Sequence, residues 1–318
     1  MAEAHSQTDD LEFLTRAFSG HGVDEASLIS ILGTSHPDQR RALRKSNPHF
    51  FKEDERLFER WDDHSFALLK LEFLRFKNAV VLWAMHPWER DARLLKEALL
   101  VGPSYSNIII EVACTRSSEE LLGARMAYHS LFEHSIEEEI AFRMKDSEGM
   151  LLVALVSAYR YDGPKYKEDV VKFEAKFLAA AIKSAEGKSL IEDEEVIKIL
   201  TTRSKLHLEA VHKHYKEISG CSLDEDLISD SILRETVRCL CTPERYFSQI
   251  LNESLKTDAP ENMKKALTRV IVTRADVDIK EIEEEFENLY GVPLLKRIES
   301  TSKGNYRDFL LALISKGR

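Results

Sequence analysis

The chain has 318 residues and carries 45 Lys and Arg against 55 Asp and Glu, a formal net charge of −10 at pH 7. So acidic a composition argues against nucleic-acid binding and against simple attraction to an anionic membrane, because both need clusters of basic side chains. Gly and Pro number only 12 and 8 while 43% of the residues are hydrophobic, which favours helices around a substantial core.

One segment recurs along the chain with a period of roughly seventy to eighty residues. Each clear copy has an apolar stretch that ends in Thr-Arg, an aromatic residue twelve positions after the Arg, and an apolar residue eight positions further on. The copies run through Arg116, Tyr128 and Ile136, through Arg203, Tyr215 and Leu223, and through Arg274, Phe286 and Leu294. A blurred first copy, Ile31–Ser35, lies one period upstream, so the sequence predicts four repeats.

Each repeat is predicted to contain several short amphipathic helices, which the second repeat defines best. We expect helices there at 90–101, 107–115, 117–132, about 135–144 and 150–159. Gly102 and Pro103 separate the first two helices, and Ser117 with Glu120 forms a capping box for the third. No stretch alternates with period two for long enough to predict a sheet, so the predicted fold class is all-α.

Two segments interrupt this pattern. The polar, turn-rich segment Tyr161–Asp169 is predicted to be a linker between two halves, and the charged segment Phe50–His64 makes the first repeat longer than the others. The expected organisation is a short tail at 1–8, repeats at 9–88, 89–162, 170–247 and 248–318, and a linker at 163–169.

Several phrases of the sequence resemble the annexin family, and in particular its plant branch. They are Ala79–Trp83 with Pro87–Asp91, Glu111–Arg116, Ser157–Tyr161, Leu267–Val270 with Val272–Ala275, and Gly304–Asp308. The resemblance spans nearly the whole chain. It implies four annexin repeats of about five short helices each, arranged as a curved disc, that bind acidic phospholipid on the convex face through Ca²⁺ held in loops.

The family's calcium signature is Gly-x-Gly-Thr followed about forty residues later by an acidic residue, because glycines let backbone carbonyls turn inward and one carboxylate completes the site. The first repeat keeps this loop best. The ligands implied by the resemblance are the carbonyls of Phe18, Gly20 and Gly22 and the carboxylate of Glu72, with Asp62 and Asp63 as less favoured carboxylates. A single carboxylate predicts a Kd on the order of 10⁻⁴ M or poorer without lipid.

The other loops depart from the signature. The second repeat has Leu100–Tyr105 without paired glycines, although Asp146 lies near the acidic position. The third loop, Ser184–Ser189, does not match, and the fourth, Lys256–Glu261, has Thr301 near the position of the acid. The sequence therefore predicts one calcium site, in the first repeat, or little more than one, and this small number argues against strong calcium dependence.

Other reactive side chains favour ordinary explanations. His21, at the loop tip, could strengthen binding to anionic lipid when it is protonated, although an exposed histidine of no special role is an equal reading. His212 and His214 point to different sides of one helix, which argues against a zinc site with His207. Buried apolar packing is favoured for Cys114 and Cys239 over a redox role. With no catalytic constellation in the sequence, an enzyme is not expected.

The leading hypothesis is a cytoplasmic protein that associates peripherally with anionic membranes through calcium. Residues 1–10 have no apolar run typical of a signal peptide, and no stretch of eighteen apolar residues could span a bilayer. The alternatives are a calcium-independent membrane or protein scaffold, which can include self-association, and a redox enzyme centred on Cys114 and Cys239. Roles in vesicle traffic, stress response or ion conductance would rest on family analogy alone.

Overall fold

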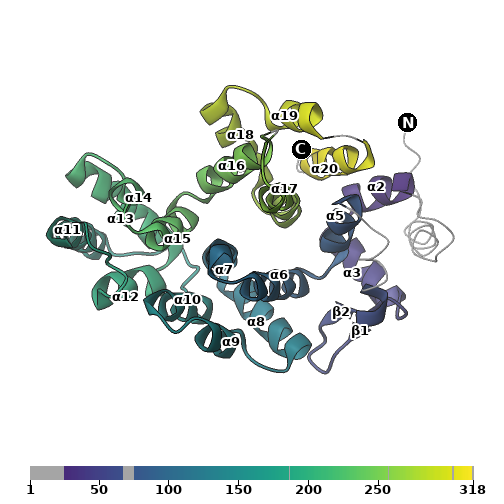
Figure 1. Ribbon diagram of the computed structural model, residues 1–318, viewed down its shortest axis with the longest axis horizontal. Coiled ribbons are helices and arrows are strands. Elements are labelled where there is room, and N and C mark those ends of the chain that lie inside the picture. The colour runs from purple at the N-terminus through teal and green to yellow at the C-terminus, as the bar shows by residue number, and fades with distance from the viewer. Residues whose placement is uncertain (1–24, 67–74, 186, 257, 303, 317–318) are drawn as a thin grey trace. The chain divides into compact units, whose positions relative to one another are not determined.

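The computed structural model describes residues 25–66, 75–185, 187–256, 258–302 and 304–316. These residues form helices and one two-stranded hairpin, so the predicted all-α class is confirmed apart from the hairpin (Figure 1). The chain divides into two compact units, one made of residues 1–86 with 247–318 and the other of residues 87–246.

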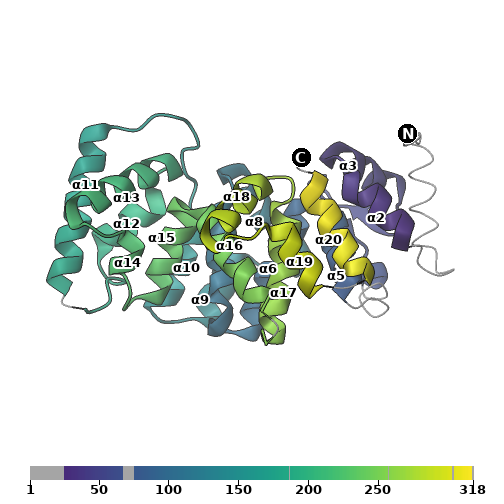
Figure 2. The ribbon, with the colours of Figure 1, turned by 90° about the horizontal axis from the view of Figure 1, so that it is seen from above.

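The first unit is built from both ends of the chain. Its elements are α2 (Glu25–Thr34), α3 (Pro37–Ser46), β1 (Phe51–Glu53), β2 (Glu59–Trp61), α5 (Arg75–Ala84), most of α16 (Pro243–Ser254), α17 (Glu261–Arg274), α18 (Ile279–Tyr290), α19 (Leu294–Thr301) and α20 (Gly304–Lys316). Helices α2 and α20 lie side by side (Figure 1, Figure 2), and a Cβ added to Gly33 would lie 2.9 Å from the Cβ of Ala312. Segments from the two ends of the chain therefore share one core.

The second unit is continuous in sequence and holds the two middle repeats. Its elements are α6 (Pro87–Val101), the 3-10 helix η1 (Pro103–Tyr105), α7 (Ser106–Thr115), α8 (Ser118–Phe132), α9 (Ile136–Arg143), α10 (Ser147–Ser157), α11 (Glu168–Ala185), α12 (Glu194–Thr202), α13 (Lys205–Ser219), α14 (Leu223–Asp226) and α15 (Ser231–Cys241). The five helices predicted for the second repeat correspond to α6 to α10, and their existence is confirmed.

The repeated offsets in the sequence mark helix ends. The Thr-Arg pair closes the second helix of its repeat, and the aromatic residue is buried in the next helix. The apolar residue eight positions later is the first residue of the fourth helix in all three copies: Ile136 of α9, Leu223 of α14 and Leu294 of α19. Ser135 and Ser222 begin two of these helices with capping boxes, so local capping sets the boundaries.

The first repeat is blurred because a hairpin replaces part of its third helix. Helix α3 has 10 residues, against 15 in α8 and in α13, and ends where the Asn47 side chain donates to the Leu43 carbonyl at 2.8 Å. The chain then forms the antiparallel pair β1–β2, in which Phe51 lies opposite Trp61. Both aromatic rings are buried, and their centroids are 4.3 Å apart. The segment 50–64 is thus a small packed insertion.

Charged side chains join the two middle repeats within the second unit. Arg160 donates to the carbonyls of Leu200 and Arg203 at 2.6 and 2.7 Å, at the end of α12. Lys205 donates to the Arg116 carbonyl at 2.7 Å, at the end of α7. Each repeat therefore supplies a cation to the carboxyl end of a helix in the other, where cations are favoured.

The two middle repeats lie in one compact unit. The segment 161–169 was predicted to separate two halves, but it lies inside the second unit, and the observed divisions fall at 86/87 and 246/247. A polar, turn-rich composition indicates a loop, but it does not reveal that residues on either side of the loop hold the adjoining repeats together.

Candidate calcium loops

Two loops of each repeat bear on calcium binding: the loop between its first and second helices and the loop between its fourth and fifth helices. The predicted ligands of the first repeat, Phe18, Gly20, Gly22 and Glu72, lie outside the described residues, as does His21. They remain predictions.

The two alternative carboxylates of the first repeat are engaged elsewhere. Asp62 lies 2.5 Å from Lys52 Nζ and accepts a hydrogen bond of 3.1 Å from the Ser65 amide. These contacts, with that of Lys52 the largest, lower the pKa of Asp62 to about 2. Asp63 forms an ion pair of 3.2 Å with Arg60. Both carboxylates thus have cationic partners in this structure, and the assignment of Glu72 stays a prediction.

The first loop of the second repeat is short and has only one glycine, Gly102. Helix α6 ends at Val101, Gly102 has a φ of +108°, and η1 leads directly into α7. Asp146, in the second loop of this repeat, caps α10 by accepting from the Gly149 amide at 2.9 Å. Without paired glycines to turn carbonyls inward, this loop departs from the calcium signature.

The third repeat brings an acidic side chain against its first loop. Asp230 accepts hydrogen bonds from the Ser189 hydroxyl at 2.5 Å and from the Leu190 amide at 3.1 Å, and its side chain also caps α15. Only 6% of Asp230 is exposed. Asp230 was not predicted from the sequence because its loop lacks paired glycines, although its separation of 41 residues from Ser189 matches the spacing of the signature.

Among the described residues of the fourth repeat, the position of the acid is occupied by hydroxyl side chains. Thr301 is the last residue of α19, and its hydroxyl donates back to the Arg297 carbonyl at 2.9 Å. Ser302 follows. A hydroxyl that bonds its own helix does not supply the charged ligand that the signature needs.

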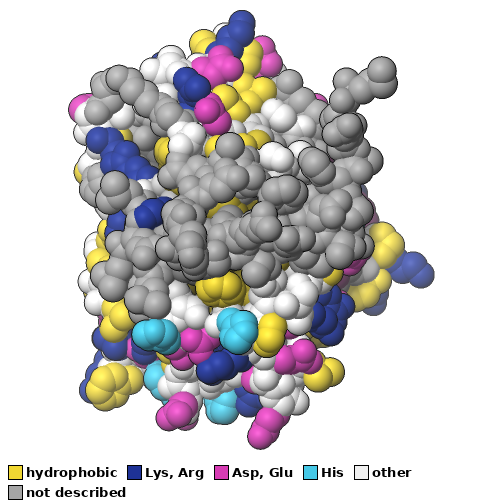
Figure 3. All heavy atoms as spheres, turned by 90° about the vertical axis from the view of Figure 1, so that its right-hand side faces the viewer, with side chains coloured by type: hydrophobic (Ala, Val, Ile, Leu, Met, Phe, Trp, Pro, Cys, Tyr) yellow, Lys and Arg dark blue, Asp and Glu magenta, His cyan; other side chains and the backbone are white. Residues whose placement is uncertain are grey.

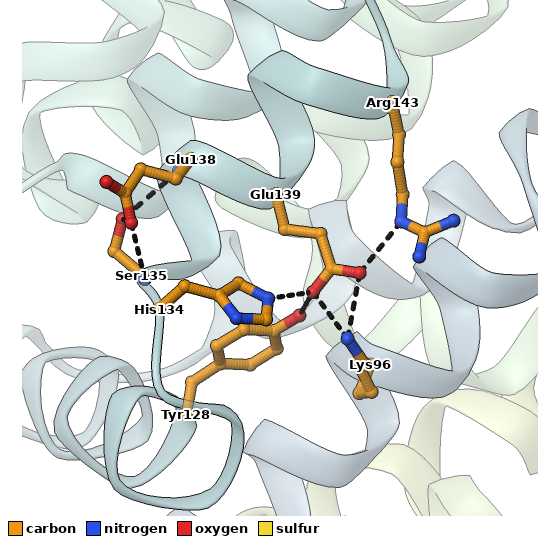
Figure 4. A network of polar contacts seen from close by, with 7 residues as sticks. All are labelled: Lys96, Tyr128, His134, Ser135, Glu138, Glu139 and Arg143. Atoms are coloured by element: carbon orange, nitrogen blue, oxygen red, sulfur yellow. Dashed lines mark hydrogen bonds and ion pairs between the residues drawn. The ribbon is translucent and has the colours of Figure 1, made fainter.

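A buried carboxylate connects the helices that carry the loops of the second repeat. Glu139 of α9 is 5% exposed and accepts from four side chains. The donors are Lys96 Nζ at 2.8 and 2.9 Å, the Tyr128 hydroxyl, His134 Nε2 at 2.8 Å and Arg143 Nε at 2.8 Å (Figure 4). Burial alone would raise the pKa of the Glu139 carboxyl, but the four hydrogen bonds outweigh burial and hold that pKa at about 2.

The Glu139 network positions the two loops of this repeat relative to each other. Lys96 lies on α6, which leads into the first loop, and Glu139 lies on α9, which ends just before the second. The third repeat has a smaller counterpart, in which the Tyr215 hydroxyl donates to Asp226 at 2.6 Å. In both repeats the acid follows the tyrosine by 11 residues, a spacing that the sequence analysis did not use.

The remaining cysteines and histidines of interest are engaged in packing or pairing. Cys114 and Cys239 are buried on α7 and α15, which pack together, and burial raises the pKa of Cys114 to about 11. His207 lies 2.7 Å from Glu174, and His214 lies between two carboxylates, those of Glu168 and Glu217. Within the described part of the chain, no group of three or more His, Cys, Asp or Glu side chains could hold a metal ion.

Comparison with known proteins identifies the family. A family model for annexins matches residues 177–231 and 246–313. Annexin D4 of Arabidopsis thaliana is 55% identical over 313 residues, which cover 96% of this chain and 98% of that protein. The chain belongs to the annexin family. Annexin Gh1 of Gossypium hirsutum is 38% identical over 314 residues, covering 97% of this chain and 95% of that annexin, so the plant resemblance is confirmed.

Solved annexin structures agree with the fold. Chicken annexin V in complex with Zn²⁺ aligns with a TM-score of 0.79 and 27% identity, covering 98% of this chain and 96% of that one. Annexin III aligns with a TM-score of 0.81 at 24% identity, covering 98% and 94%. The likeness to annexin III is one of fold alone.

Membership of the annexin family indicates which ion and which kind of surface this protein binds. It supports Ca²⁺ as the ion that this annexin binds, and calcium-dependent association with phospholipid membranes as its general activity. Annexins are not classical enzymes. Among the described residues, no helix is both long enough and apolar enough to cross a bilayer.

Proposed function

We propose that this annexin docks on anionic phospholipid membranes through one calcium ion held in the loop of its first repeat. The carbonyls of Phe18, Gly20 and Gly22 and the carboxylate of Glu72 would hold the ion, and lipid phosphate would complete its coordination. The proposal is supported chiefly by the contacts of the other three repeats, where each acidic or hydroxyl group at the carboxylate position is bonded within the protein.

The net charge supports a bridging role for calcium. At −10, the chain would be repelled by an acidic bilayer unless a cation lay between them. Because one carboxylate leaves the site weakly charged, lipid and calcium each strengthen the binding of the other, so neither alone should hold the protein on the membrane.

The test is co-sedimentation with phosphatidylserine liposomes, in calcium and in chelator. Calcium should drive wild-type protein into the pellet, and Glu72→Gln should abolish this pelleting. Asp146→Asn is the matched control, since it removes the same charge from the second repeat, where the carboxylate only caps α10; its pelleting should match wild type. Calcium-driven pelleting that survives Glu72→Gln would overturn the assignment of Glu72.

A second candidate function is a calcium-independent scaffold that binds a membrane or another protein, including a second copy. Basic side chains near the hairpin favour it: Arg41, Lys45 and Lys52 are half exposed or more. Figure 3 shows histidine, lysine and arginine side chains low on the face that it views, with acidic side chains interspersed among them. Pelleting that persists in chelator but falls with added salt would support this function over the first.

A further inference from the structure

The first loop of the third repeat is closed by bonds within the protein. The Asp230 carboxylate, from the loop before α15, accepts from the hydroxyl of Ser189 and the amide of Leu190. A second bond ties the same loop to the neighbouring repeat, since the Ser147 hydroxyl donates to Glu192 at 2.8 Å. Two loops that are 41 residues apart in sequence are thus joined by hydrogen bonds within the protein.

This arrangement excludes calcium for a chemical reason. A calcium site needs carbonyl oxygens and a carboxylate with free lone pairs, whereas the Asp230 oxygen that faces the loop already accepts two hydrogen bonds. To bind this oxygen, a cation would have to break the hydrogen bonds from the Ser189 hydroxyl and the Leu190 amide at once. The Leu190 amide would then be left without its partner.

We propose that Ser189 is the residue that keeps calcium out of the third repeat, and that Asp230 is a latent ligand. Gly187 already has the left-handed conformation, with a φ of +81°, that lets a loop turn its carbonyls. Ser189→Gly would remove the hydroxyl and place a second glycine two positions after Gly187. The loop would then have the paired glycines of a calcium loop, with Asp230 released to face the ion. This inference does not depend on the first-repeat site.

The test measures calcium binding by titration calorimetry in a background that lacks the first-repeat carboxylate. Glu72→Gln alone reports on the proposed function. Adding Ser189→Gly should create one calcium site per chain, and adding Asp230→Asn as well should remove that site. The proposal is overturned if folded Ser189→Gly protein gains no calcium binding, or if the gained site survives Asp230→Asn.

Thermal unfolding gives an independent readout in the same background. In chelator, both Ser189→Gly and Ser189→Ala should unfold at a lower temperature than their parent, because the bond to Asp230 is lost. Calcium should restore the unfolding temperature of Ser189→Gly and leave that of the parent unchanged. If Ser189→Gly and its parent unfold at the same temperature in chelator, the hydroxyl does not close the loop and the inference fails.

Discussion

Replacing Glu139 by Gln should destabilise the second unit in a pH-dependent way. Glutamine has nearly the same shape, but it removes the charge that holds Lys96 and Arg143 and places an amide donor among four donors. Lowering the pKa from an ordinary 4.5 to about 2 corresponds to about 3 kcal/mol of stability near neutral pH.

Exposure of the partner side chains to solvent reduces this stabilising free energy. The side chains of Lys96, His134 and Arg143 are 21%, 39% and 35% exposed, so water can solvate them once the carboxylate is gone. We therefore expect Glu139→Gln to lower the free energy of unfolding at pH 7 by about 2 to 3 kcal/mol.

The sign of the pH dependence follows from the direction of the shift. Because the pKa of Glu139 is lower in the folded state than in the unfolded state, the stabilisation is present above pH 4.5 and is lost as the pH falls towards 2. The difference in stability between wild type and Glu139→Gln should therefore shrink between pH 5 and pH 3.

Urea unfolding followed by circular dichroism, repeated from pH 7 to pH 3, measures this difference. Glu138→Gln is the control, because Glu138 neighbours Glu139 on α9 but only caps that helix through Ser135, a role that glutamine retains (Figure 4). A difference below 1 kcal/mol at pH 7, or one that stays constant to pH 3, would refute the reasoning.

Two substitutions and one labelling experiment further test packing and burial. Arg116→Ala should lower the free energy of unfolding by about 3 to 5 kcal/mol in urea, because Asp91, bonded to Arg116 at 2.6 and 2.8 Å, would be left buried and unpaired. Gly123→Ala should cost about 1 to 3 kcal/mol in the same assay, since the new Cβ would lie 2.1 Å from the Trp88 ring. Cys114, whose thiol pKa burial raises to about 11, should react with iodoacetamide at pH 8 only once the protein unfolds; prompt labelling of the folded chain would contradict its burial.

Features set by local sequence were the predictable part of the fold. Capping boxes such as Ser117 with Glu120 fix helix starts within a few residues, so the repeat offsets led directly to helix boundaries. The hairpin was missed because strands of three residues are too short to show alternation. Glu59 of β2 is buried against Arg44 of α3, at 3.0 Å, a contact that no local pattern reveals.

The candidate site likewise has one part that local sequence predicts and another that only the fold reveals. Paired glycines mark a loop locally, and the prediction of Gly20 and Gly22 as ligands depends on that pattern. Asp230 meets Ser189 only after the fold has brought together two loops 41 residues apart. Its acidic side chain looked ordinary in sequence, because a carboxylate gains a role here only from the donors that surround it.

Arg160 and Lys205 bond the two middle repeats to each other, so we expect the smallest stable part of this protein to be a pair of repeats and not a single repeat. Each middle repeat depends on the other for a cation at a helix end, so neither should be autonomous. A protease that cuts in 163–169 should leave two fragments that stay bound to each other, and either fragment expressed alone should fray at α7 or α12. Chimeras with other annexins should exchange these two repeats as a pair.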